Sequence, residues 1–287
     1  MSWSFCPSAD DFARLRRKSL LTNESTHCLT WGAISRSAKS ASGPGRYRFL
    51  TYGEGKNLTA HAVIDHHSDE LILAAMNEQQ VTALLCFLDR QSIEPHRLFG
   101  PREATRRFAD KWQKSAHRHF QVEMKQALYE VRQVRTPTPA GGRLVLASPP
   151  HSERVTDFLT GFVSECFPTE EHSATQLKKR ADRLITEQKG FLWEDADETI
   201  VSMAAIVRES PNTTSISLVY TPRESRGQGH AACVVAALSQ AQLDAGKVAC
   251  NLHTDLSNPT SNRVYSRIGY ELIQHNLRVR LFKTPKQ

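Results

Sequence analysis

The segment 215–232 constrains the fold of this chain more than any other part of the sequence. The stretch 215–220 alternates small polar and apolar residues as a strand does, and Pro222, which has no N–H, ends it. Arg226-Gly227-Gln228-Gly229-His230-Ala231 then leads into small and apolar residues typical of a helix. Glycine allows close backbone approach, and the first N–H groups of a helix lack partners within it. This order predicts an anion-binding helix N-terminus in an α/β domain.

A second motif follows further along the chain. Asn258-Pro259-Thr260-Ser261-Asn262-Arg263-Val264-Tyr265 forms a predicted helix that Ile268-Gly269-Tyr270 closes. In this order and spacing the two motifs resemble the cofactor-binding core of the GCN5-related N-acetyltransferase (GNAT) family. The resemblance is to the bacterial two-domain type with an FR47-like C-terminal catalytic domain. The family signature is Arg or Gln, two residues, Gly, one residue, then Gly or Ala, and Arg226, Gly229 and Ala231 match it.

The resemblance implies that acyl-CoA, with acetyl-CoA expected, binds along these motifs. The backbone at the end of the strand would pair with the pantetheine amides, and the glycine-rich turn would hold the pyrophosphate. The implied cofactor-binding residues are Val219, Tyr220, Thr221, Arg226, Gly227, Gln228, Gly229, His230, Ala231, Asn258 and Asn262. Asn262 is equally well interpreted as a helix-capping residue.

The resemblance also implies a catalytic acid. The Tyr265 hydroxyl would lie near the thioester sulfur and protonate the departing thiolate. The alternative is a core aromatic on an amphipathic helix. For the base that deprotonates the amine, Glu194 and Asp195 are candidates, and a backbone carbonyl or a water relay stays open. The Val219 N–H is the expected oxyanion donor.

Other phosphate-binding motifs match less well. Residues 227–232 also satisfy the dinucleotide pattern G-x-G-x-x-A, but a Rossmann turn follows the first strand of its domain directly. Here the turn 221–226 intervenes, and three predicted strands come earlier in the domain. A Walker A loop needs G-K-[ST], which the sequence lacks there. A glycine-rich helix entry with no ligand is the remaining alternative for this segment alone.

Proline and glycine divide the chain. Arg135-Thr136-Pro137-Thr138-Pro139-Ala140-Gly141-Gly142-Arg143 cannot continue a helix or central strand, which predicts a boundary near residue 138. We expect an α/β (α+β) chain whose residues 139–287 form the GNAT domain with a mixed central sheet. Residues 1–138 would form a smaller α/β domain, a candidate degenerate GNAT-like copy that binds no CoA. The spacing over 122–134 suits a helix or a helix leading into a strand, and 270–275 and 277–282 suit two final strands.

Composition narrows the class of protein. Of the 287 residues, 39% are hydrophobic and 23% are charged, which is typical of a globular chain. No stretch resembles a signal peptide or a membrane span, so a cytoplasmic enzyme without membrane partners is expected. The net charge of +7 is dispersed rather than gathered in one stripe with aromatics, so no nucleic-acid partner is expected. The six cysteines and the histidines lack zinc-site spacing, which predicts no metal.

The sequence thus predicts an N-acyltransferase. The acyl group, with acetyl expected, would pass from acyl-CoA to a primary amine by direct attack in a ternary complex. The acceptor would be a small molecule or a peptide, and the protein a monomer or a homodimer. The alternative is a non-catalytic module that binds acyl-CoA as a sensor or scaffold.

Overall fold

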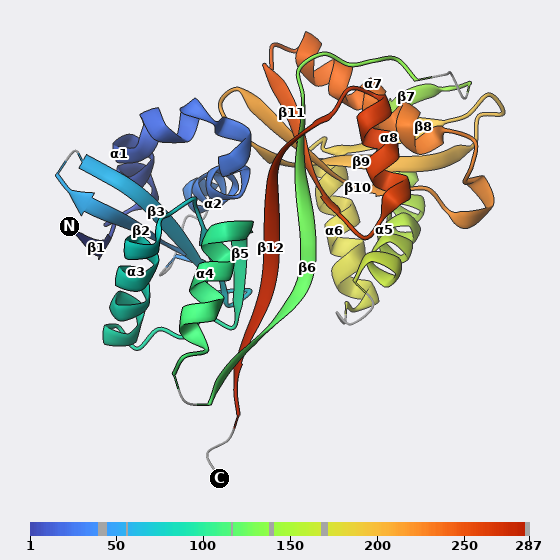
Figure 1. Cartoon of the computed structure of the whole chain (residues 1–287). Coiled ribbons are helices and arrows are strands. Elements are labelled where there is room, and N and C mark those ends of the chain that lie inside the picture. Colours follow the sequence, from blue (N-terminus) through green and yellow to red (C-terminus); the bar gives the residue numbers. More distant parts are fainter. Residues whose placement is uncertain (40–44, 56, 116, 138–140, 168–171, 285–287) are drawn as a thin grey trace. The chain divides into compact units, whose positions relative to one another are not determined.

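The computed structural model describes residues 1–39, 45–55, 57–115, 117–137, 141–167 and 172–284 (Figure 1). Contacts divide the chain into two compact units. Unit 1 comprises Met1–Leu128, Thr254–Ser257 and Leu272–Gln287, and unit 2 comprises Tyr129–His253 and Asn258–Glu271. The predicted boundary near residue 138 lies outside the described residues. The last strand groups with unit 1 rather than with the rest of 139–287, because residues 276–280 pair antiparallel with 97–101.

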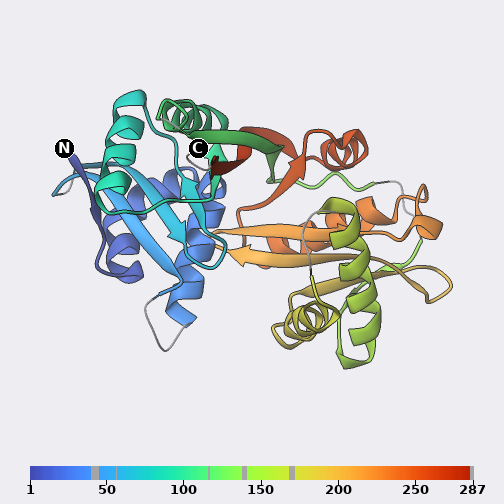
Figure 2. The same cartoon turned by 90° about the horizontal axis from the view of Figure 1, so that it is seen from below.

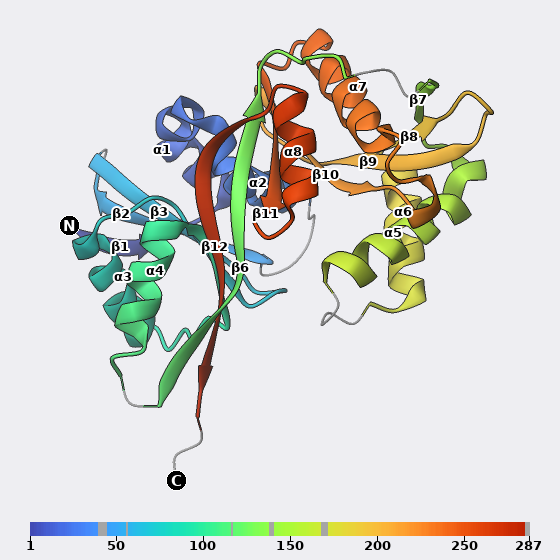
Figure 3. The ribbon, with the colours of Figure 1, turned by 45° about the vertical axis from the view of Figure 1, so that its right-hand side comes forward.

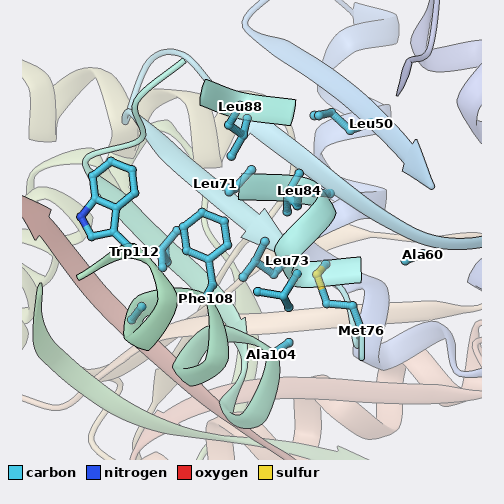
Figure 4. Close-up of a cluster of buried hydrophobic side chains, with 14 of the residues drawn as sticks. Leu50, Ala60, Leu71, Leu73, Met76, Leu84, Leu88, Ala104, Phe108 and Trp112 are labelled. Carbon is cyan, nitrogen blue, oxygen red and sulfur yellow. The ribbon is translucent and has the colours of Figure 1, made fainter. Parts of the chain in front are cut away.

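Unit 1 is an α/β unit with a seven-stranded order β1-β2-β3-β4-β5-β12-β6. Its elements are β1 (Ser2–Phe5), α1 (Ala9–Thr22), α2 (Cys28–Lys39), β2 (Tyr47–Glu54), β3 (Asn57–Asp65), β4 (Glu70–Leu73), α3 (Glu78–Arg90), β5 (Arg97–Pro101), α4 (Arg102–Trp112) and β6 (Arg118–Val131), joined by the final strand β12 (Glu271–Lys283). One core, under α3 and α4, contains Leu71, Leu84 and Phe108 (Figure 4). A second core, under α1 and α2, contains Phe12 and Phe49. Unit 1 therefore buries both faces of its sheet.

Unit 2 has the strand order β11-β10-β9-β8-β7. Its elements are β7 (Arg143–Leu146), α5 (Ser152–Cys166), α6 (Ala174–Thr186), β8 (Gly190–Glu194), β9 (Ile200–Glu209), β10 (Thr213–Tyr220), the short 3₁₀ turn η3 (Arg223–Ser225), α7 (His230–Asp244), β11 (Ala249–Asp255) and α8 (Pro259–Arg267). Helices α5 and α6 lie together on one side of these strands (Figure 2). Helix α7 packs on the other side, with α8 beside it (Figure 3).

The two halves of the chain repeat one order of elements. β1-α1-α2-β2-β3-β4-α3-β5-α4-β6 and β7-α5-α6-β8-β9-β10-α7-β11-α8-β12 are the same series of helices and strands. The predicted mixed fold, with an N-terminal copy of the C-terminal one, is therefore confirmed. Two details of the prediction were wrong: residues 118–131 form strand β6 without a helix, and β12 is one strand where two were expected.

Local sequence explains where the helices begin. Ser173 caps α6, and its Oγ accepts from the Gln176 N–H while the Gln176 side chain accepts from the Ser173 N–H. Leu177, Ala181 and Leu184 follow at helical spacing and are buried against the sheet. In the described part of the chain, no helix has the length and apolar content to cross a bilayer.

Candidate functional site

Strands β10 and β11 separate partway along their length. Their parallel pairing joins Thr213 to Ala249, Thr214 to Cys250 and Ser215 to Asn251. Both strands continue, β10 to Tyr220 and β11 to Asp255, but among the described residues the pairing stops at Ser215. Backbone groups on this part of β10 can therefore face an extended ligand as they would face a neighbouring strand.

A backbone irregularity marks the same part of β10. Against β9 the register shifts between Ser217 and Tyr220. Leu218 within that shift has φ of +55°, an uncommon conformation for a branched apolar residue. Such bulges re-aim side chains and interrupt regular pairing near functional sites. Val219, the expected oxyanion donor, follows the bulge directly and is half-buried.

The glycine-rich turn leads from β10 into α7 as predicted. Gly227 and Gly229 have φ of +81° and +86°, which glycine adopts at little cost. A Cβ built at Gly227 would meet nothing within 4 Å, so the turn is open on that side. The first α7 N–H with a helical partner is that of Cys233, which donates to the Gly229 carbonyl at 3.1 Å. The amides of the preceding turn lack intrahelical partners by helix geometry and give this end partial positive charge.

The side chains of this turn divide into exposed and buried ones. Gln228 is exposed, and Ala231 is half-buried in the first helical turn. His230 is 4% exposed, and among the described residues its Nδ1 has no hydrogen-bond partner. A buried polar atom without a partner is costly unless a ligand or water satisfies it. The His230 side chain therefore adds a second reason to expect a ligand near this helix end.

Arg226 holds the turn against α5. Its Nε donates to the Thr221 carbonyl at 2.8 Å, and Nη2 donates to both Glu165 carboxylate oxygens at 2.8 and 3.0 Å. Burial alone would raise the pKa of Glu165, but the Arg226 and Arg223 guanidinium groups outweigh it and lower that pKa. Arg226 is one of the implied cofactor-binding residues, and in the structure its side chain also joins the turn after β10 to α5.

Tyr220 and Thr221 complete this tether. The Tyr220 ring packs against Phe158, and its hydroxyl lies so close to Gly161 that a Cβ there would come within 2.3 Å. Burial, and then the Glu165 carboxylate, raises the pKa of Tyr220. The Thr221 hydroxyl is 2.8 Å from the Ser202 hydroxyl. The side chains of Tyr220 and Thr221 thus hold the end of β10 in place. Their backbone groups are the ones that the sequence prediction assigns to ligand binding.

Helix α8 carries the second motif. Asn258 caps it: its Oδ1 accepts from the Ser261 N–H at 3.1 Å. Asn262 is half-buried one turn further, so it is not the helix cap that the sequence left open as an alternative. Tyr265 is 8% exposed and packs in the α7-side core beside Tyr270, with 6.0 Å between ring centroids.

The Tyr265 phenol is neutral over the physiological range. Burial is the main cause that raises its pKa far above the ordinary value, and Cys166 adds to it. The phenol therefore keeps its proton at neutral pH, and the same raised pKa makes it a weaker acid than an ordinary tyrosine.

The two acids proposed as the base are engaged elsewhere. Glu194 accepts a hydrogen bond from Arg143 at 2.7 Å, and Asp195 accepts the N–H groups of Asp197 and Thr199. Glu194 is the last residue of β8 and Asp195 follows it, and β9 separates β8 from β10. Sequence reasoning missed a group nearer to the opening: His253, on β11 beyond the last paired residue, which burial and the Arg208 charge hold neutral with a pKa of about 3.

These features provide backbone groups that can bind an extended ligand with an anionic part. The opened strand pair suits the pantetheine arm, and the amides before Cys233 suit a pyrophosphate, because both ligand parts need bare backbone donors. Among the described residues, no group of three or more His, Cys, Asp or Glu side chains could hold a metal ion.

Comparison with known proteins identifies similar sequences and similar folds. Residues 196–279 match the model of the family described as FR47-like protein. Curated proteins yield no match. A GNAT acetyltransferase from Colwellia psychrerythraea is 14% identical, with 99% of this chain and 100% of that chain covered and a TM-score of 0.59. A GCN5-related N-acetyltransferase from Sphaerobacter thermophilus is 15% identical, with coverage of 98% and 95% and a TM-score of 0.63.

One more structure matches both halves. A tandem GNAT protein from the clavulanic acid biosynthesis pathway is 11% identical, covers 100% of both chains and has a TM-score of 0.57. At these identities the likeness concerns the fold. The predicted resemblance to the GNAT acetyltransferases is thereby confirmed at the level of the fold, and the FR47-like match lies almost wholly in unit 2 and the strand that follows it.

Proposed function

We propose that this chain, which has the GNAT fold in two copies and an FR47-like segment, is an N-acyltransferase acting through unit 2. The acyl group, with acetyl expected, passes from acyl-CoA to a primary amine by direct attack. The observation that carries the proposal is the separation of β10 from β11 after Ser215 and Asn251, beside the bulge at Leu218. That opening ends at the glycine-rich entrance of α7, where a thioester carrier would place its pyrophosphate.

The residues of unit 2 have separate tasks in this proposal. Acyl-CoA supplies an activated thioester when bound. The Val219 N–H polarises a carbonyl at the bulge, and the amides of His230 and Ala231 hold phosphate oxygens. Tyr265, which is protonated at neutral pH, donates its phenolic proton to a departing thiolate, although its raised pKa works against this transfer because a thiol is the stronger acid.

A CoA-binding sensor is the second candidate, and one observation favours it. Tyr265 is only 8% exposed, and burial raises the pKa of its phenol, which makes it a poorer proton donor to a thiolate. A sensor would need the backbone groups that bind CoA but would not need a proton from the Tyr265 phenol.

Turnover of matched proteins decides between the two. CoA release from acetyl-CoA is measured with a panel of primary amines for the wild type and for Tyr265→Phe, with CoA affinity measured by calorimetry in parallel. Catalysis predicts amine-dependent release that falls at least ten-fold in Tyr265→Phe while CoA affinity is retained. Tight CoA binding without release above background hydrolysis for any amine would favour the sensor.

A further inference from the structure

Three arginines line one pocket of unit 2, at the C-terminal half of α8. The pocket has a volume of about 450 Å³, and its lining contains Arg135, Arg263 and Arg267. Asn262 and Ser266 complete the lining. The volume falls in the range of about 300–1,000 Å³ that is typical of small-molecule sites. Because all five side chains are polar, the pocket suits a polar ligand.

Two contacts hold Arg135 beside the end of α8. Its N–H donates to the Ile268 carbonyl at 3.0 Å. A Cβ built at Gly269 would lie 3.5 Å from the Arg135 Cγ and 2.7 Å from the Gln133 carbonyl oxygen. Gly269 has φ of +99°, so glycine suits this close packing. Arg135 is therefore fixed next to the two arginines of α8, although it is remote from them in sequence.

The protein supplies no counter-charge to this pocket. Within the described ranges, none of Arg135, Arg263 and Arg267 forms an ion pair with a carboxylate. Arg263 has only a long contact, from its Nε to the Pro259 carbonyl at 3.4 Å. Three like charges around one pocket repel one another, so an external anion would lower the electrostatic energy there.

Helix capping does not account for the arginines. Cations near a helix C-terminus can hydrogen-bond its last carbonyls. Here backbone N–H groups already bind those carbonyls, since Ile268, Gly269 and Tyr270 donate to Val264, Ser266 and Tyr265, respectively. The guanidinium groups of Arg263 and Arg267 therefore have N–H donors for another acceptor.

The pocket lies on a different face of α8 from the proposed catalytic residue. Successive helical residues are about 100° apart, so Arg263 and Arg267 each point about 160° away from Tyr265. Tyr265 is buried in the α7-side core, and both arginines are exposed. Asn262, one of the implied cofactor contacts, borders the pocket between these faces. The arginine face is thus separate from the place where the proposed function puts the thioester.

We propose that this pocket binds a small molecule that carries a phosphate monoester, at a site distinct from that of acyl-CoA. A phosphate monoester has a charge of about −1.5 to −2 at pH 7 and three strong acceptor oxygens. It can offer one oxygen to each guanidinium group, which a singly charged carboxylate cannot. Arginine binds phosphate oxygens in a bidentate fashion. The pocket exceeds the volume of a phosphate group, which leaves room for the organic part of the ligand.

Calorimetry with simple probes tests the phosphate site. Ribose 5-phosphate, inorganic phosphate, acetate and ribose are titrated into the full chain at low ionic strength. At least one of the two phosphates should bind about ten-fold or more tightly than acetate, and ribose should not bind. Binding of neither phosphate, or acetate binding equal to that of both phosphates, would overturn the proposal.

Variants show whether the phosphate occupies the arginine pocket. Arg263→Gln and Arg267→Gln should each weaken phosphate binding about ten-fold, since each removes one charge-assisted contact. Arg132→Gln is the matched control, because Arg132 is exposed near Arg135 but pairs with Glu130 at 2.8 Å and does not line the pocket. It should change the affinity by less than about two-fold, because exposed charges are screened. Thermal melting verifies that the variants are folded. Equal losses in the control and the pocket variants would overturn the proposal.

CoA itself carries a phosphate monoester on its ribose, so it provides the last arm of the test. The phosphate titration is repeated on protein saturated with CoA. Unchanged phosphate affinity supports a distinct site. Phosphate binding that is lost in the CoA-loaded protein would overturn it. If Arg267→Gln also weakened the binding of CoA but not of dephospho-CoA, the pocket would belong to the ribose phosphate of CoA.

Discussion

Gly161 provides a test of how α5 positions the end of β10. It lies inside α5 (Ser152–Cys166), where glycine is usually unfavourable. Helix propensity alone predicts that Gly161→Ala stabilises the protein by roughly 1 kcal/mol. The structure predicts the opposite, because the new Cβ would lie 2.3 Å from the Tyr220 hydroxyl oxygen and 2.4 Å from the adjoining ring carbon. The tyrosine ring is rigid and has Phe158 beside it, so it cannot yield freely.

The magnitude follows from the competition between these two effects. Overpacking costs about 1–3 kcal/mol. With the propensity gain subtracted, we expect Gly161→Ala to lower the free energy of unfolding by about 1 kcal/mol, or Tm by about 2–4 °C. In a Tyr220→Ala background the obstacle is gone, so the same change should stabilise by about 1 kcal/mol.

Chemical denaturation of the four proteins of this cycle measures the coupling. Reversal of the sign between the two backgrounds would support the packing of Tyr220 against Gly161. Stabilisation by Gly161→Ala in the wild-type background would refute it. Displacement of Tyr220 should also weaken CoA binding several-fold, since Val219 and Tyr220 form the end of β10 and Thr221 follows directly.

Two further predictions concern charge. Glu165→Gln should cost less than about 1 kcal/mol of stability, because the Arg226 and Glu165 side chains are 43% and 31% exposed. Calorimetry should nevertheless show weaker CoA binding by this variant. Unchanged affinity would contradict the role of the Arg226–Glu165 ion pair in holding the turn. Burial, then the Arg16 charge, lowers the pKa of His27 from 6.5 to about 4. The unfolded chain therefore binds the extra proton first, so stability should fall as pH drops from 6.5 to about 4. Thermal melts should show a shallower fall in His27→Gln, and an identical slope would contradict this.

The sequence was most informative where Gly and Pro fix the backbone. The turn from Pro222 to Gly229 and the helix after it lie where predicted, since few other residues adopt the φ values of Gly227 and Gly229. A degenerate copy of the fold was also expected in residues 1–138, and the repeated order of elements agrees with it.

Other features depend on partners remote in sequence. Leu218 gives no local sign of its positive φ, which follows from the register of β10 against β9. The pairing of β12 with β5 joins residues 276–280 to residues 97–101, which are far apart in the sequence, and periodicity cannot reveal it. Glu165 and Arg226 are 61 residues apart, so their ion pair was equally hidden. The contact between α5 and the end of β10 had one local indication in the sequence, Gly161. A glycine inside a helical pattern often marks a place where another side chain packs closely.

Calorimetric titration of CoA into Gly229→Glu and Gly246→Glu is the most direct test of the proposed site. Both glycines flank α7 with a positive φ, +86° at its start and +92° at its end, so both substitutions carry similar backbone strain. Only the first places a carboxylate where phosphate oxygens are expected. The account predicts that Gly229→Glu loses about 100-fold or more in affinity while Gly246→Glu binds CoA like the wild type. Wild-type affinity in a folded Gly229→Glu protein would contradict it.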